Sequence, residues 1–168
     1  MNETEQIAAV IPRLRRYARA LLGDRAEADD LVQDTLERAW RKAALWRPGS
    51  DLRAWLFAIM HNVFVNQTRT RRTNMEEPLD EAVLEHPAAS DAAAGAQLLD
   101  LASALAKLPA EQREVVLLVG LEEFTYEEAA RALGIPIGTV MSRLARGRER
   151  LRQLMSGGTS APSLRVVK

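Results

Sequence analysis

The feature that most restricts the fold of this chain is the spacing of its apolar residues, which recur every three or four positions along most of its length. The pattern is clearest in residues 28–43, which follow Asp24 and Glu27 at the spacing of a helix capping box. Alanine and leucine, with 27 and 23 copies, outnumber the 16 valines and isoleucines, and this balance favours helices over strands. We therefore expect an all-α protein.

A stretch of different composition, residues 74–96, interrupts the helical pattern. It contains two prolines, many small residues and an excess of acidic residues, which are features of a flexible linker. It divides the chain into two units, residues 1–73 and 97–155, each small enough that its core is marginal alone. Residues 156–168 are rich in Gly, Ser and Pro and are expected to form a disordered tail. The predicted fold is two small helical domains joined by a linker.

In the first unit, Pro12 is expected to begin a helix that ends at Gly23, with room for a short helix before it. Ser50 is expected to cap a third helix, in which residues 54–65 are apolar nearly all round. One core cannot easily bury every side of such a helix, so neighbouring helices or a partner must cover part of it. The side chains that need this cover are Phe57, Met60 and Phe64.

The second unit contains a pattern typical of a helix-turn-helix. Residues 110–121 fit either a buried strand or a helix, and their acidic start and the lack of a second strand favour the helix. Thr125 and Glu128 form a predicted capping box for a short helix that ends at Gly134, and a longer helix follows over residues 140–154. Arginines on the exposed side of that last helix can reach phosphates and guanines in the major groove, which indicates DNA binding.

Charged residues are segregated along the chain, although 23 basic residues balance 23 acidic ones. Basic clusters at residues 69–72 and 131–152 would attract an anionic polymer such as nucleic acid. In contrast, one face of the helix predicted after Asp24 is mainly acidic. That face is either simply solvated or a binding surface for a partner. Its residues are Asp30, Gln33, Asp34, Glu37 and Arg41.

Several protein classes are excluded. No stretch approaches the ~20 apolar residues of a membrane-spanning helix, and the N-terminus resembles neither a secretory signal nor a transit peptide, so we expect a cytoplasmic protein without membrane insertion. With no cysteine and only His61 and His86, a metal site is not expected. There is no Gly-rich phosphate loop and no histidine near a plausible nucleophile, so we expect neither an enzyme nor a cofactor.

Three motifs together resemble one known family. They are AEADDLVQDTLERAW at 26–40, GSDLRAWLFAIMHNVFVNQTRTRR at 49–72 and LPAEQREVVLLVGLEEFTYEEAARALGIPIGTVMSRLARGRERLR at 108–152. In this order and at this spacing they resemble the extracytoplasmic-function (ECF) group of bacterial sigma factors, in the sigma-70 class, over about residues 12–155. The resemblance implies a sigma region 2 helical bundle in residues 1–73 and a sigma region 4 helix-turn-helix in residues 97–155.

The resemblance also implies partners and site residues. The first motif is similar to the family's main contact with the clamp helices of RNA polymerase β′, and the family also contacts the β flap. Its candidate polymerase-binding residues are Asp30, Gln33, Asp34 and Glu37. The second motif is similar to the part that captures a flipped base of the minus-10 element and holds the strand open. Its candidate residues are Trp46, Ser50, Asp51, Trp55, Asn62, Arg69, Arg71 and Arg72.

The last helix is similar to the family's reader of the minus-35 element in duplex form. Its candidate residues are Thr139, Met141, Ser142, Arg143, Arg146 and Arg148. The function implied is that of a sigma factor that directs core polymerase to specific promoters and promotes DNA melting in a stress or signal response. An anti-sigma factor would be the third partner, beside polymerase and promoter DNA.

Two alternatives remain. A dimeric helix-turn-helix regulator would bind a palindrome through two copies, and it would leave the motifs at 26–72 without a role. A sigma-like decoy would only sequester an anti-sigma factor, and the intact aromatic and arginine positions argue against it.

Overall fold

Helices are the only regular elements in the part of the chain that the structure describes, residues 2–74 and 92–156, which confirms the all-α prediction. In this computed structural model the predicted linker lies mostly outside the described residues, and so does the predicted tail from residue 157 onward. The elements are α1 (Glu3–Leu22), α2 (Arg25–Arg41), the 3₁₀ helix η1 (Ala43–Leu45), α3 (Leu52–Asn74), α4 (Ala92–Ala106), α5 (Ala110–Gly120), α6 (Tyr126–Leu133) and α7 (Ile137–Met155).

Helix α1 begins well before Pro12, so the prediction that Pro12 starts a helix is wrong. The side chain of Asn2 accepts a hydrogen bond from the Glu5 backbone N–H at 2.8 Å, and the Glu5 carboxylate accepts one from the Asn2 N–H at 3.1 Å. This capping box starts the helix earlier in the chain, and Pro12 lies on its exposed side, where the missing N–H costs one helical hydrogen bond. The predicted end is confirmed, because Gly23 adopts the left-handed conformation with φ of 73°.

The first turn of α2 is capped in a different way from the one predicted. Asp24 accepts a hydrogen bond from the Ala26 N–H at 3.3 Å and is the cap, but Glu27 does not complete a capping box. The Glu27 carboxylate instead pairs with Arg71 of α3, with 2.9 Å between Oε1 and Nη1. The Glu27 carboxylate therefore binds Arg71, which is distant in sequence, and not the backbone at the start of α2, as the local pattern predicted.

The predicted cap of α3 is also wrong by one residue. Asp51 accepts the hydrogen bond from the Ala54 N–H at 3.2 Å, whereas the Ser50 hydroxyl donates to the Arg47 carbonyl at 2.6 Å. Ser50 thus belongs to the turn before the helix.

The helices of the first unit, α1 to α3, bury one side of each helix against the others. The residues that fill this core include Leu14, Leu21, Leu31, Leu56 and Met60. The three side chains that were expected to need extra cover, Phe57, Met60 and Phe64, are all buried within the chain itself.

The helix-turn-helix prediction is confirmed at α6 and α7. Thr125 and Glu128 form the capping box with both hydrogen bonds at 3.1 Å, and Gly134 ends α6 with φ of 64°. The helix predicted at residues 110–121 is α5 (Ala110–Gly120). Val140 and Leu144 of α7 are buried in the core of the second unit.

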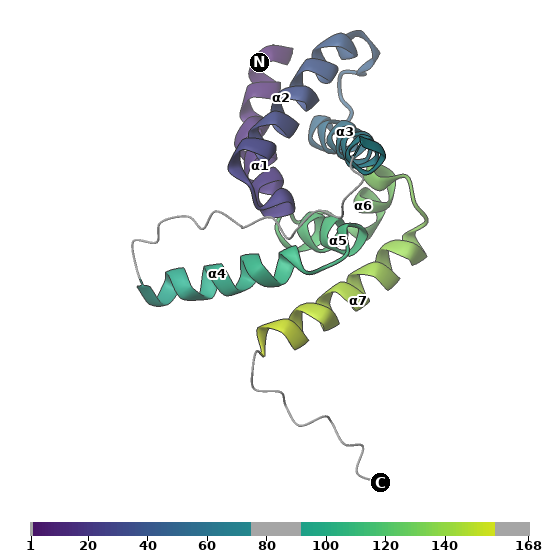
Figure 1. Ribbon diagram of the computed structural model, residues 1–168. Coiled ribbons are helices and arrows are strands. Elements are labelled where there is room, and N and C mark those ends of the chain that lie inside the picture. Colours follow the sequence, from purple (N-terminus) through teal and green to yellow (C-terminus); the bar gives the residue numbers. More distant parts are fainter. Residues whose placement is uncertain (1, 75–91, 157–168) are drawn as a thin grey trace.

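The two units share one core in this structure. Figure 1 shows α5 and α6 between the helices of the first unit and the outer helices α4 and α7. Phe124, in the turn between α5 and α6, packs edge-on against Phe57 of α3, which packs in turn against Tyr17 of α1, with ring centroids 5.2 Å apart in both pairs. The aromatic contacts join α1 and α3 to the second unit.

Helix α7 approaches α5 closely at Gly147, which is buried. A Cβ atom at this position would lie 2.7 Å from Cγ2 of Val116 and 3.5 Å from Cβ of Gln112. Because valine has few alternative rotamers, the side chain of Val116 cannot easily move away.

We expect Gly147→Ala to lower the free energy of unfolding by about 1–3 kcal/mol, because the added methyl group overpacks the contact between α5 and α7. Chemical denaturation followed by circular dichroism measures this change. Gly138→Ala is the matched control on the same helix, since open space surrounds that position. It should be neutral or stabilising, and an equal loss of stability in both variants would contradict the close-packing explanation.

Candidate functional site

The candidate polymerase-binding residues lie together on the exposed face of α2, as their helical spacing predicts. All of Asp30, Gln33, Asp34 and Glu37 are exposed. Asp34 accepts a hydrogen bond from Nε2 of Gln67 on α3 at 2.6 Å, which orients its carboxylate. Glu37 pairs with Arg41 one turn later at 2.6 Å. The face therefore presents accessible carboxylates on a rigid helix.

The loop between η1 and α3 borders a cavity of about 580 Å³ beside the start of α1. Asn2, the cap of α1, and Glu3 in its first turn line it together with Trp46, Gly49 and Ser50 of the loop. The indole N–H of Trp46 is buried and has no acceptor among the described residues. A buried donor without a partner is costly and would favour a ligand that offers an acceptor.

Candidate minus-10 residues on α3 are divided between two sides of the helix. Trp55, Asn62 and Arg69 are spaced seven residues apart and so share one face. Asn62 and Arg69 are exposed and Trp55 is half-buried, and Arg72 is exposed nearby. Arg71 does not join them, because it faces α2 and pairs with Glu27.

On α7, four of the six candidate residues for reading duplex DNA are exposed. They are Met141, Ser142, Arg146 and Arg148. Thr139 and Arg143 are half-buried, and the Arg143 guanidinium is 3.8 Å from the Glu111 carboxylate of α5. The exposed arginines of α7 are free of the core and can reach a duplex groove.

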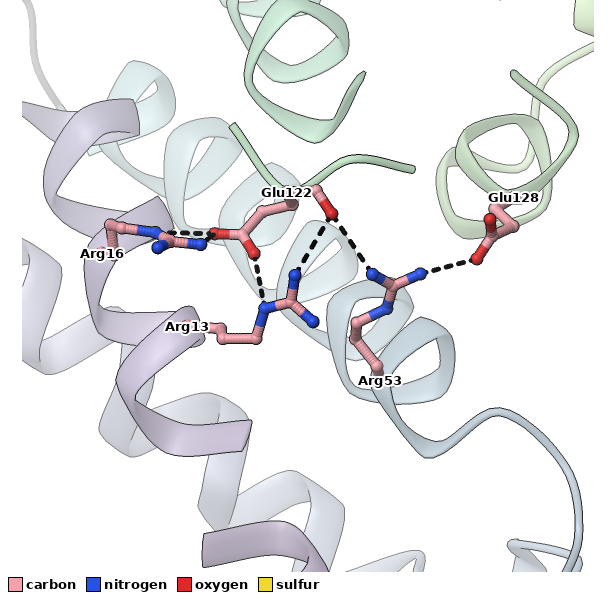
Figure 2. Close-up of polar contacts among 5 residues, drawn as sticks. All are labelled: Arg13, Arg16, Arg53, Glu122 and Glu128. Carbon is pink, nitrogen blue, oxygen red and sulfur yellow. Dashed lines mark hydrogen bonds and ion pairs between the residues drawn. The ribbon is translucent and has the colours of Figure 1, made fainter. Parts of the chain in front are cut away.

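The sequence patterns missed a polar cluster at the boundary between the two units, which Figure 2 shows. The Glu122 carboxylate, in the turn after α5, has no exposed surface and lies 3.1 Å from both the Arg13 and Arg16 guanidinium groups of α1. Arg53 of α3 donates to the Glu122 carbonyl at 3.2 Å and to the Glu128 carboxylate at 2.8 Å. The Arg53 guanidinium also lies 4.4 Å from the centre of the Phe124 ring. The local sequence does not indicate that Glu122 is buried while its neighbour Glu123 is exposed.

A second missed contact at this boundary involves Arg113 of α5. Its guanidinium donates to the carbonyl of Leu21 at the end of α1 at 2.8 Å. It also donates to the carbonyls of Leu105 and Ala106 at the end of α4, at 2.7 and 3.0 Å, and to that of Leu108 in the following turn at 2.7 Å. Burial lowers the pKa of Arg113, although the nearby Glu114 opposes this change. A single cation thus caps the ends of two helices from different units.

Buried polar groups continue along the same boundary. His61 Nδ1 of α3 lies 2.6 Å from Glu114 Oε1 of α5. Burial raises the pKa of Tyr17 well above its ordinary value, and the charges of Glu114 and Glu122 raise it further. Glutamates of the second unit therefore meet arginines, a histidine and a tyrosine of the first.

The pKa of Glu128 is lowered, chiefly by the hydrogen bond from the Thr125 backbone N–H and further by the Thr125 hydroxyl and Arg53. Because the folded pKa lies below the unfolded one, Glu128 contributes stability above the unfolded pKa of about 4.3. That contribution is lost as the pH falls through the lower pKa of the folded state.

We expect Glu128→Gln to unfold more easily than the unchanged protein at pH 6, by less than about 1 kcal/mol, and the difference to shrink as the pH falls below about 4.3. Urea denaturation at a series of pH values measures it. Glu127→Gln, on the same turn but outside the capping box, is the control and should show a smaller pH dependence. A difference that grew toward low pH would contradict the assignment.

Membrane-spanning helices and metal-binding clusters are both absent from residues 2–74 and 92–156. No helix in these ranges is long and apolar enough to cross a membrane. No group of three or more His, Asp or Glu side chains in them is arranged to hold a metal ion.

The fold and these surfaces define a helix-turn-helix protein with a second, helical unit that carries an acidic face. Residues 7–61 match the family described as the Sigma2 domain of PhyR, and residues 98–151 match Sigma-70, region 4. The ECF RNA polymerase sigma factor EcfG of Rhodopseudomonas palustris is 39% identical over 151 residues, which cover 90% of this chain and 83% of that protein. The chain therefore belongs to the ECF RNA polymerase sigma factors, as its motifs predict.

Solved structures agree with this assignment. The sigma factor RpoE in complex with the anti-sigma factor NepR from Bartonella quintana has a TM-score of 0.81 and 39% identity, with 92% of this chain and 96% of that chain covered. CnrH in complex with the cytosolic domain of CnrY has a TM-score of 0.68 and 29% identity, with 91% and 86% covered. The roles of individual site residues stay predictions.

Proposed function

We propose that this sigma factor directs core RNA polymerase to specific promoters, promotes melting of the DNA at the minus-10 element and is held inactive by an anti-sigma factor until a signal arrives. The observation that carries the proposal is that the sigma-type unit with an exposed acidic helix and the region 4 helix-turn-helix occur in one chain. The polymerase supplies the chemistry, and the sigma factor supplies binding energy. Domain limits at 1–73 and 97–155, with an acidic linker at 74–96, are part of the proposal.

Polymerase binding is assigned to the exposed face of α2. Single surface ion pairs contribute little, typically about 0–1 kcal/mol, so several carboxylates on one rigid helix are needed for a useful contact. The hydrogen bond from Gln67 to Asp34 reduces the freedom that this side chain would lose on binding. The clamp helices of β′ are the proposed partner of this face, and the β flap is the proposed partner of the second unit.

Strand opening is assigned to the loop before α3 and to one face of α3. An extruded base loses its stacking energy, and an aromatic side chain such as Trp46 or Trp55 can replace it by about 1–3 kcal/mol. The buried indole N–H of Trp46 can donate to an acceptor on a base, and Ser50 and Asp51 are exposed beside it. Asn62 and Arg69 on α3 would then hold the strand edge and backbone.

Duplex recognition is assigned to the exposed side of α7. Arginine makes bidentate hydrogen bonds to guanine or phosphate, and Arg146 and Arg148 are exposed on this helix. Each reader can bind weakly because the polymerase holds both on one scaffold and so raises their combined affinity.

Control by an anti-sigma factor is supported by the relatives and by an exposed apolar surface. The solved structures of RpoE and CnrH are complexes with NepR and with CnrY. In this chain Leu98 on α4 is 61% exposed and Leu101, one turn later, is 39% exposed, so the two leucines form a small apolar surface on one side of the helix. The proposed function predicts that an anti-sigma helix covers such a surface.

We expect Asp34→Arg to weaken binding to core polymerase about tenfold or more, because it replaces an attractive charge by a repulsive one. Affinity for core polymerase is measured by fluorescence anisotropy. Asp29→Arg is the matched control, since Asp29 is exposed on α2 but lies outside the acidic face. Equal weakening by both variants would contradict the assignment of the face.

We expect Arg146→Ala to reduce promoter-dependent transcription about tenfold or more while binding to core polymerase is unchanged. The assay combines purified core polymerase, the sigma factor and a library of promoter fragments. Arg152→Ala, nearer the C-terminal end of α7 and paired with Glu149, is the control. Absence of start-site-specific transcripts with the unchanged chain, together with binding to a symmetric operator, would overturn the proposed function in favour of a dimeric regulator.

A further inference from the structure

Glu122 joins the two units through charges that cannot stay buried alone. Its carboxylate has no exposed surface, whereas the Arg13 and Arg16 side chains are 36% and 52% exposed. A buried charge that loses its partners is strongly destabilised, so Glu122 can remain in this position only while the arginines of α1 stay beside it. Water can take over the role of the partners only if the units separate.

The arginines that contact Glu122 would become exposed without an acidic partner if the units separated. Separation of the units would leave Arg13, Arg16 and Arg53 on one surface of α1 and α3, with Glu122 and Glu128 withdrawn (Figure 2). Three guanidinium groups on one surface repel each other and attract a multivalent anion. Guanidinium groups bind carboxylates and phosphates with the same bidentate geometry.

The proposed function requires such a separation. The minus-10 and minus-35 elements lie about 25 base pairs apart, which corresponds to about 85 Å of duplex at 3.4 Å per base pair. A compact chain of this length has a radius of gyration of about 15 Å and is therefore about 40 Å across. A molecule with its units packed together cannot contact both elements at once.

We propose that Arg13, Arg16 and Arg53 form a binding surface for the DNA backbone near the minus-10 element, and that Glu122 occupies this surface as an internal competitor while the units are closed. The proposal rests on the proposed function for the identity of the DNA. Arg53 lies in the first turn of α3, two residues after Asp51 of the candidate strand-binding set, whereas Trp55 points to the other side of the helix. Phosphate oxygens thus replace the Glu122 carboxylate when the units separate, and the arginines remain paired in both states.

A first experiment measures the closed state without DNA or polymerase. The chain has no cysteine, so Ala44→Cys and Ala145→Cys, both at exposed positions, allow specific labelling with a fluorophore pair in the full chain. Energy transfer should fall in Glu122→Gln and in Arg16→Gln, with the ratio of open to closed molecules raised about tenfold or more. The matched controls are Glu123→Gln and Arg15→Gln, which are exposed neighbours and should give the energy transfer of the unchanged chain.

A second experiment tests whether the arginines of α1 and α3 bind DNA or only hold the two units together. The probe is a forked DNA of mixed sequence, and its affinity for the full chain is measured at several salt concentrations. Glu122→Gln should bind about tenfold more tightly than the unchanged chain, because the competitor is removed. Arg16→Gln also opens the units but removes part of the surface, so adding it to Glu122→Gln should abolish most of this gain. The slope of the logarithm of the DNA-binding constant against the logarithm of the salt concentration should also be smaller in magnitude by about 0.7–0.9 in the double variant than in Glu122→Gln. This is the value of one phosphate contact.

Two results would overturn the proposal. Unchanged energy transfer in Glu122→Gln would show that Glu122 does not hold the units together. Equal DNA affinity and salt slope for Glu122→Gln with and without Arg16→Gln would show that the arginines do not bind the backbone. Because neither experiment uses polymerase, these results are independent of the transcription assay that tests the proposed function. Circular dichroism of each variant verifies that its helices are intact.

Discussion

The carboxylate of Glu122 is fully buried and depends on cations supplied by the other half of the chain, so it can occupy this position only while the two units are in contact. Arg13 and Arg16 neutralise it from α1, while Arg53 holds the adjacent carbonyl from α3. Phe124, two residues further, then packs against Phe57 and below Arg53. A charged residue and an aromatic residue of one short turn thus fix α6 against α3. This boundary combines an aromatic contact with buried charged groups.

The surfaces assigned to polymerase and DNA differ in how the closed arrangement affects them. The acidic face of α2 is exposed, and so are the arginines at the outer side of α7. Arg53 and His61 of α3 are instead in contact with the second unit, through Glu128 and Glu114. The closed arrangement therefore leaves the proposed polymerase contact available while it covers one side of the helix proposed to hold the open strand.

The sequence predicted structures that depend on residues close together in the chain. It did not predict contacts in which residues distant in the chain compete for the same side chain. Gly23, Gly134 and the Thr125–Glu128 capping box follow from local backbone chemistry, and the structure confirms them. The capping box expected at Glu27 fails because Arg71, on another helix, pairs with its carboxylate. Glu122 and Glu123 are identical in type and adjacent in sequence, so only the packing of α1 and α3 determines which one is buried. The exposed residues of α2 and α7 could be found from helical spacing, whereas the arginine cluster on α1 and α3 could not.

The four carbonyls held by Arg113 have a mechanical consequence. One belongs to the C-terminal end of α1, and the other three belong to the end of α4 and the turn that follows it, so a single guanidinium on α5 binds both helix ends. Loss of the hydrogen bond to Leu21 would release the C-terminal end of α1. The connection between α4 and α5 would stay intact, because the other three hydrogen bonds of Arg113 lie within it. If the units separate as proposed, Arg113 would lose one of its four hydrogen bonds to carbonyls and stay attached to the second unit by the other three.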